Sequence, residues 1–127
     1  DAQMKAIGFS RQKTRYARIL AEAIQSGELD CRSLNRLNDE TARAELMKLT
    51  GIGLWTADVY LLMILLRPDI WPCGDIALAN AMRVAKHLES RPDNDRQLEI
   101  AERWRPYRAV AARCLWRYYL SGYVTRK

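Results

Sequence analysis

The chain has 127 residues, 49% of them hydrophobic, so a single domain with one core, comprising residues 1–127, is expected. Lys and Arg outnumber Asp and Glu by 21 to 15, and the net charge of +6 suits a polyanionic partner, although many basic surfaces are simply solvated. Three widely spaced cysteines argue against a disulfide framework, and the longest apolar stretch, residues 59–66, is too short to span a bilayer. These features predict a soluble, intracellular protein without a membrane partner.

Hydrophobic residues recur at helical spacing through almost the whole chain, and no segment shows sustained alternation with a period of two. A first helix is expected over residues 11–26, because Gly27 follows it as a stop signal. One helical turn is expected near residues 33–37. Asn38 then precedes two acidic residues, which is typical of an N-cap and predicts a helix that ends at Gly51.

The second half of the chain has the same helical character. A long apolar helix is expected over residues 54–66, before Pro68, and another begins after Asp75 and runs to about residue 88. A loop then leads to a short helix through residues 102–104, and a final helix is expected between Pro106 and Gly122. The fold class predicted is all-α, without an internal repeat.

Two glycines around one aliphatic residue, Gly51-Ile52-Gly53, connect two of these helices with no room for an ordinary loop. Glycine allows a positive φ and a close approach of another backbone. The amides of this turn and of the next helical turn have no helical partners and lie at the positive end of a helix dipole. The turn is therefore a candidate phosphate site, although a Gly-x-Gly sequence between helices is more often only a tight turn.

Asp75 falls where an N-cap belongs, directly before a helix. An aspartate in this position usually caps amide groups, and capping alone is the simpler interpretation. The helix dipole also favours the ionised carboxylate, and a fixed negative charge can stabilise a positive charge that develops in a reaction. Such a carboxylate can also orient a water molecule for attack. Capping and catalysis are compatible roles.

The turn resembles the hairpin of the helix-hairpin-helix DNA glycosylases over nine consecutive residues, from Leu49 to Ala57 (LTGIGLWTA). In that family an apolar helix and a Gly/Pro loop lead from the hairpin to an essential Asp, and Asp75, 24 residues after Gly51, matches it. The segments IGFS (7–10), RPD (67–69) and ERWRPYR (102–108) are similar to bacterial 3-methyladenine DNA glycosylase II. The resemblance covers nearly the whole chain.

The resemblance implies an all-α helical bundle of the helix-hairpin-helix glycosylase type, with Asp75 as the catalytic residue. Its carboxylate is then expected to stabilise the oxocarbenium ion at C1′ as the N-glycosidic bond breaks. The implied partner is double-stranded DNA with a damaged base, and the hairpin binds DNA phosphates through main-chain amides, here those of Gly51, Gly53, Trp55 and Thr56. A structural Na⁺ or K⁺ ion braces the hairpin in the family, and the matching main-chain carbonyls are those of Met47, Leu49 and Ile52. No other cofactor is expected.

Two departures from related subfamilies narrow the chemistry. Bifunctional members have a nucleophilic Lys at the position of Trp55, and an indole cannot form a Schiff base, so a lyase step is not expected. The endonuclease III branch carries a four-Cys loop near its C-terminal end, where this chain has only Cys114, so no iron–sulfur cluster is expected. The prediction is a monofunctional glycosylase that releases alkylated purines of the 3-methyladenine type in base excision repair.

Aromatic residues are the candidates for the base pocket, because an alkylated purine is cationic and binds electron-rich ring faces. Tyr107 matches a pocket aromatic of the family, and Trp104 is a second candidate that fits a core position equally well. Trp116 and Tyr118 are interpreted as core residues. The preferred base is left open among 3-methyladenine, 7-methylguanine, 1-methyladenine, hypoxanthine and uracil.

Relatives have several helices before the segment that matches the first residues of this chain. The domain is therefore expected to be incomplete at its N-terminus, and an N-terminal segment or a second chain is expected to complete it. The 127 residues alone are then expected to lack full activity. The alternatives are a non-catalytic helix-hairpin-helix DNA-binding module and a helical scaffold with incidental basic charge.

Overall fold

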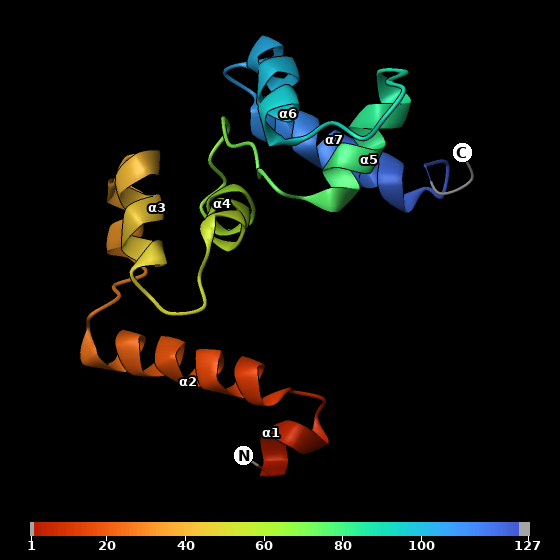
Figure 1. Cartoon of the computed structure of the whole chain (residues 1–127). Helices are drawn as coiled ribbons and strands as arrows, with labels where there is room; N and C mark the ends of the chain where they lie inside the picture. Colours follow the sequence, from red (N-terminus) through yellow and green to blue (C-terminus); the bar gives the residue numbers. More distant parts are fainter. Residues whose placement is uncertain (1, 125–127) are drawn as a thin grey trace. The chain divides into compact units, whose positions relative to one another are not determined.

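The computed structural model describes residues 2–124, which contain helices and no strand (Figure 1). The elements, in chain order, are α1 (Ala2–Ala6), α2 (Arg11–Ser26), η1 (Ser33–Arg36), α3 (Asp39–Met47), α4 (Leu54–Met63), α5 (Ile76–Ala85), α6 (Asn94–Ala101), η2 (Glu102–Trp104) and α7 (Arg108–Leu120). The all-α prediction is confirmed. The chain forms two compact units, of which the first ends at Gly53 and the second begins at Leu54.

Local capping groups set the ends of the helices in the first unit. Ser10 Oγ accepts a hydrogen bond from the Lys13 amide at 3.2 Å and starts α2, and Gly27, with a φ of 80°, ends it as expected. Asn38 Oδ1 accepts from the Thr41 amide at 2.8 Å and starts α3, which confirms the predicted N-cap. The buried side chains of this unit include Ala23, Leu29, Leu34, Ala42, Leu46 and Leu49.

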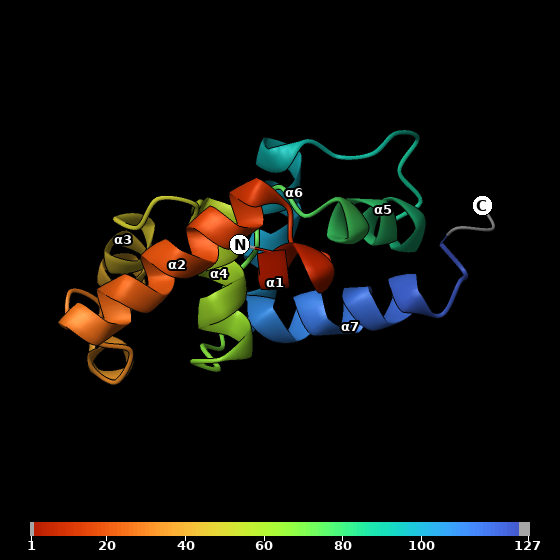
Figure 2. The ribbon, with the colours of Figure 1, turned by 90° about the horizontal axis from the view of Figure 1, so that it is seen from below.

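In the second unit, α5 and α7 lie side by side (Figures 1 and 2). Ala81 and Val84 of α5 pack with Val124, and Leu115 of α7 covers this cluster. A guanidinium nitrogen of Arg113 donates to the main-chain oxygen of Leu62 at 2.9 Å and so joins α7 to α4. The side chains with the largest fully buried volumes here are Leu61, Leu62, Ile70, Pro72, Leu78 and Met82.

α3 ends at Met47 rather than at Gly51, so the expected bound is wrong there. Three further helices depart from their expected bounds. α4 ends at Met63 rather than near residue 66, because the amides of Ile64 and Leu65 both donate to Tyr60 O and Leu66 has a φ of 54°. α5 ends at Ala85, since His87 adopts a φ of 53° and leaves the helical conformation.

The last difference is that the short helix expected through residues 102–104 begins earlier, as α6. Asp93 Oδ1 accepts from the Arg96 amide at 2.8 Å and provides the N-cap. None of the helices in the described part of the chain is both long and apolar enough to cross a bilayer.

Candidate functional site

The hairpin turn is closed by a hydrogen bond in which the Ile52 amide donates to Leu49 O at 3.1 Å. Gly51 has a φ of 98°, a conformation that an L side chain rarely adopts, and the ring of Tyr16 packs against it. Gly53 does not have a positive φ, and a side chain there would meet nothing within 4 Å. The two glycines are therefore different: the backbone requires the first, whereas the second has open space where a side chain would lie.

Asp75 is the N-cap of α5, as the sequence predicted. Its Oδ1 accepts a hydrogen bond from the Leu78 amide at 2.8 Å, and only 8% of the residue is exposed. Gly74 precedes it with a φ of 85° and turns the chain into the helix. The carboxylate is thus held at the positive end of the α5 dipole.

The second carboxylate oxygen of Asp75 has a partner that sequence analysis missed. The indole Nε1–H of Trp55, in the first turn of α4, donates to Asp75 Oδ2 at 3.0 Å. Twenty residues separate the two along the chain, and no local pattern in the sequence indicates this contact. Both oxygens of the buried carboxylate are therefore bound by neutral donors.

A hollow of about 290 Å³ lies beside Asp75 and is bordered by the N-terminal ends of α5 and α6. Gln97 lines it and is 2% exposed. Its Nε2 donates to Pro92 O at 3.2 Å, while its Oε1 has no hydrogen-bond partner among the described residues. Sequence analysis did not single out Gln97, because a lone Gln carries no periodic or motif signal.

The two aromatic residues proposed for the base pocket have different surroundings. Trp104 packs against Trp71, with ring centroids 5.6 Å apart, and Lys86 Nζ lies 5.4 Å from its ring centroid. Tyr107 is 62% exposed and more accessible to a ligand. Lys86, which lies near the Trp104 ring, is the C-cap of α5, and Asp75 is the N-cap of the same helix. The two ends of this 10-residue helix are roughly 15 Å apart along its axis. Trp104 thus has much of its ring covered by the protein.

Three charged residues form a cluster, the Asp69 clasp, consisting of Asp69, Arg105 and Arg108. Arg108 Nε donates to Asp69 Oδ1 at 2.7 Å and its Nη2 to Oδ2 at 3.0 Å, while Arg105 Nη1 donates to the same Oδ2 at 3.0 Å. The hydrogen-bonded Arg108 guanidinium holds the pKa of the Asp69 carboxyl below its ordinary value. The clasp joins the segment that carries Trp104 and Tyr107 to the loop that precedes Trp71.

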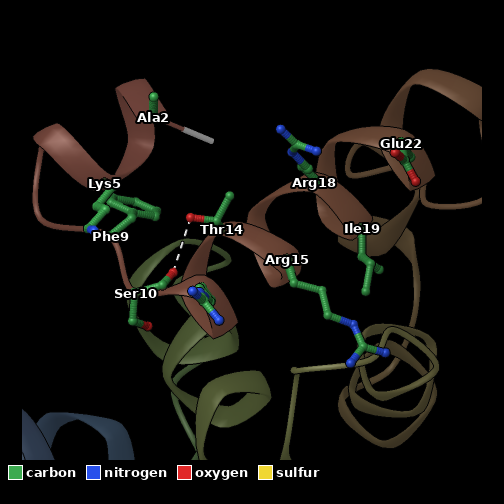
Figure 3. Close-up of a pocket in the computed structure, with 10 residues that line it drawn as sticks. Ala2, Lys5, Phe9, Ser10, Thr14, Arg15, Arg18, Ile19 and Glu22 are labelled. Atoms are coloured by element: carbon green, nitrogen blue, oxygen red, sulfur yellow. Dashed lines mark hydrogen bonds between the residues drawn. The ribbon is translucent and has the colours of Figure 1, made fainter.

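A second hollow, of about 670 Å³, belongs to the first unit and lies between α1 and α2 (Figure 3). Its lining contains more cationic than acidic side chains, with Lys5, Arg11, Arg15 and Arg18 against Glu22. Figure 3 shows Thr14 Oγ1 donating to Ser10 O, at 3.1 Å, within its wall. These cationic side chains contribute to the positive charge of the first unit. The sequence did not predict this hollow.

The comparisons with known proteins agree on one family, although no family model matches the chain. A DNA-3-methyladenine glycosylase from Bacillus subtilis is 32% identical over 106 residues, which are 84% of this chain and 35% of the relative. DNA-3-methyladenine glycosylase 1 from Schizosaccharomyces pombe is 33% identical over 115 residues, which are 90% of this chain and 50% of the relative.

Solved structures show the same relationship. The S. pombe 3-methyladenine DNA glycosylase in complex with abasic DNA matches with a TM-score of 0.85 and 33% identity, over 89% of this chain and 55% of that one. A DNA-3-methyladenine glycosidase from Bacillus halodurans matches with a TM-score of 0.80 and 28% identity, over 100% of this chain and 58% of that one.

The chain spans between 35% and 58% of the length of these relatives. The matched region includes both the hairpin and Asp75, and the fold that was expected from the resemblance is confirmed. Over the region that it shares with them, the chain is a homologue of DNA-3-methyladenine glycosylases and has the fold of the helix-hairpin-helix glycosylases.

Proposed function

We propose that the chain carries the catalytic carboxylate of a monofunctional DNA glycosylase that hydrolyses the N-glycosidic bond of alkylated purines, of the 3-methyladenine type, in base excision repair. One observation carries the proposal: Asp75 is 8% exposed, with both carboxylate oxygens bound by neutral hydrogen-bond donors. The names of the homologues support the substrate class.

The reaction follows from the charge of Asp75. The bond between C1′ and the purine nitrogen breaks, its electron pair leaves with the base, and positive charge develops on the sugar. The fixed carboxylate stabilises this charge, and a water oxygen then bonds to C1′ as its proton passes to Asp75 or to solvent. A base that alkylation has made cationic leaves as a neutral molecule, so it needs little further activation. Trp55 supplies no amine, and a covalent Schiff-base intermediate therefore has no nucleophile at this position.

The DNA partner binds through phosphates in this proposal. The main-chain amides of Gly51 and Gly53, followed in the sequence by those of Trp55 and Thr56 in the first turn of α4, are the phosphate ligands. The open face of Gly53 and the net charge of +6 support this role. An abasic-DNA complex has been obtained for the S. pombe relative.

A monovalent cation, Na⁺ or K⁺, fits the main-chain carbonyls of Met47, Leu49 and Ile52. Leu49 O accepts one hydrogen bond, from the Ile52 amide at 3.1 Å, and a carbonyl oxygen has a second lone pair for a cation. Neutral oxygen donors suit hard cations of low charge. When bound, the ion supplies positive charge near the phosphate that the hairpin holds.

Binding of the damaged base is assigned to two aromatic residues of the pocket. Tyr107 is the more accessible of the two, and Trp104 is the second. Flipping the nucleotide out of the duplex costs a few kcal/mol, and a damaged pair lowers that cost. The rest of the pocket is assigned to an N-terminal segment or a second chain, since the homologues extend well beyond the region that this chain covers.

The proposal is tested by measuring release of free base from methylated duplex DNA by the wild type and by Asp75→Asn, together with DNA affinity. The same two proteins are also made as chimeras in which the chain replaces the matching region of the S. pombe glycosylase. Base release by the wild-type chimera and none by the Asp75→Asn chimera, at similar affinity, is expected. An Asp75→Asn chimera that binds DNA and releases base as well as the wild-type chimera contradicts the proposed role of Asp75.

A further inference from the structure

The contact between Trp55 and Asp75 reaches across the second unit of the chain. Trp55 lies in the first turn of α4, whereas Asp75 caps α5, and the indole N–H donates to Oδ2 at 3.0 Å. The other oxygen, Oδ1, is bound to the Leu78 amide at 2.8 Å. Because both carboxylate oxygens accept a hydrogen bond, the orientation of the carboxylate plane is fixed.

This second hydrogen bond is needed because the terminal torsion of an aspartate is soft. A carboxylate held at one oxygen only can rotate over a broad range about the bond to its Cβ. Asp75 is 8% exposed, so solvent offers few alternative donors that would hold Oδ2 in place. The electrostatic stabilisation of a developing positive charge depends on such a preorganised geometry.

The chemistry of the donor matters as much as its position. An indole N–H is a donor only and carries no charge, whereas a Lys or Arg partner would place a full positive charge next to the carboxylate. A neutral donor to an ionised acceptor gives a strong hydrogen bond and leaves the net negative charge on Asp75 available to the sugar. The N–H edge of Trp55 is bound to Asp75, and 47% of the residue is exposed.

We propose that Trp55 is a positioning residue that fixes the orientation of the Asp75 carboxylate through its indole N–H, and so accelerates base release without contributing to DNA affinity. This role is separate from the main-chain phosphate contact assigned to the same residue. The inference rests on the proposed function for its effect on rate, but the contact itself is testable without any activity.

The first experiment compares base release in a single turnover by the chimera described above and by two variants of it. Trp55→Phe keeps an aromatic ring and removes the N–H, and replacement of Trp55 by 3-benzothienylalanine keeps the shape of the indole and removes the same N–H. The rate is expected to fall about 10- to 100-fold in both, because a hydrogen bond to a charged group is lost. Affinity for duplex DNA is expected to stay within about threefold of the wild type.

Trp71→Phe is the matched control, because Trp71 is buried and its Nε1 has no hydrogen-bond partner among the described residues. Its base release is expected to stay close to that of the wild type. A 3-benzothienylalanine variant that is folded and releases base at the wild-type rate overturns the proposal. A loss of DNA affinity equal to the loss of rate overturns it too, since a positioning residue acts on the chemical step.

The second experiment measures the contact directly, in the chain labelled with ¹⁵N-tryptophan. The indole resonance of Trp55, assigned by its absence in Trp55→Phe, is expected to move upfield in Asp75→Ala and to exchange faster with solvent. An indole resonance that is the same in both proteins shows that the contact does not form and overturns the proposal. If the wild-type chimera releases no base, the proposed function fails, and this measurement then decides the contact by itself.

Discussion

The ring of Tyr16 packs against the α-carbon of Gly51 so closely that a side chain at residue 51 would overlap it. A Cβ built on Gly51 would lie 2.6 Å from Cδ1 and 2.8 Å from Cδ2 of that ring, and closer still to Cγ. Gly51 also has a φ of 98°. The hairpin therefore depends on this glycine for two independent reasons, a steric one and a conformational one.

Gly51→Ala is predicted to destabilise the first unit by about 2–4 kcal/mol, the sum of the backbone strain and the overlap with Tyr16. Urea unfolding measures this loss. In a Tyr16→Ala background the overlap is removed and the strain remains, so the same substitution should cost roughly half as much. An equal cost in both backgrounds would show that Tyr16 does not crowd Gly51.

At Gly53, in contrast to Gly51, a side chain can be added without steric overlap, because its Cβ would meet nothing within 4 Å. Gly53→Asp is expected to fold with a stability close to that of Gly53→Asn, its uncharged control. It should bind duplex DNA at least about tenfold more weakly than Gly53→Asn, whether or not the base is damaged, because its carboxylate repels the phosphate. Equal DNA affinity of the Asp and Asn variants, measured by fluorescence anisotropy at low salt, would remove Gly53 from the phosphate site.

The helix boundaries that the sequence predicted well are those with local signals. Ser10 and Asn38 each accept a hydrogen bond from an amide three residues later, and Gly27 takes a positive φ directly after α2. Such caps depend on a few consecutive residues, so the pattern contains the information. The end of α4 was missed because the apolar pattern continues through Leu66, whereas the backbone has already left the helix there.

The features of the candidate site likewise fall into those that local sequence determines and those that tertiary packing determines. Asp75 as an N-cap was predictable, since capping is local, and so was the positive φ of Gly51. The hydrogen bond from Trp55 to Asp75 joins residues that are 20 positions apart, and tertiary packing alone determines it. The packing of Trp104 against Trp71 is equally nonlocal, and sequence periodicity did not distinguish a core position from a pocket position for that ring.

The Asp69 clasp predicts a specific dependence of stability on pH. Arg108 lowers the pKa of the Asp69 carboxyl in the folded protein, so the folded-state value lies below the unfolded-state value of about 3.9. The stabilisation is therefore fully present above about pH 4 and is lost as the pH falls through the folded-state value. Asp69→Asn is expected to be less stable than the wild type at pH 7, with a difference that shrinks below about pH 4.

Urea unfolding between pH 7 and pH 2 measures this difference. Glu99→Gln is the control, because Glu99 forms an exposed ion pair with Arg96 on the same helix, and such pairs contribute little. A stability difference between the wild type and Asp69→Asn that stays constant over the whole pH range would contradict the clasp.

The proposed cation site predicts that DNA binding depends on the kind of monovalent cation. Replacing K⁺ by N-methyl-D-glucamine at constant ionic strength should weaken duplex binding by the wild type, because the bulky organic cation does not fit between main-chain carbonyls. Constant ionic strength keeps the general screening of phosphates unchanged. Identical DNA affinities in the two buffers would show that the carbonyls of Met47, Leu49 and Ile52 do not bind a cation that supports DNA binding.

A double-mutant cycle on Trp55 and Asp75 separates capping from the indole contact. In Asp75→Asn the side-chain oxygen can still accept from the Leu78 amide, as Asn is as good an N-cap as Asp, but its NH₂ group then faces the indole N–H, donor against donor. Asp75→Asn should therefore destabilise the wild type by about 1–2 kcal/mol and the Trp55→Phe protein by clearly less.

Thermal and urea unfolding of the four proteins give the coupling energy between the two residues. Asp75→Ala is the reference for capping, because it loses the hydrogen bond to Leu78 in either background and should cost about 1 kcal/mol more than Asp75→Asn in the Trp55→Phe protein. A coupling energy of zero between Trp55 and Asp75 would mean that the indole N–H and the carboxylate do not interact in solution. A positive coupling would show that the same hydrogen bond which orients the carboxylate also contributes to the stability of the second unit.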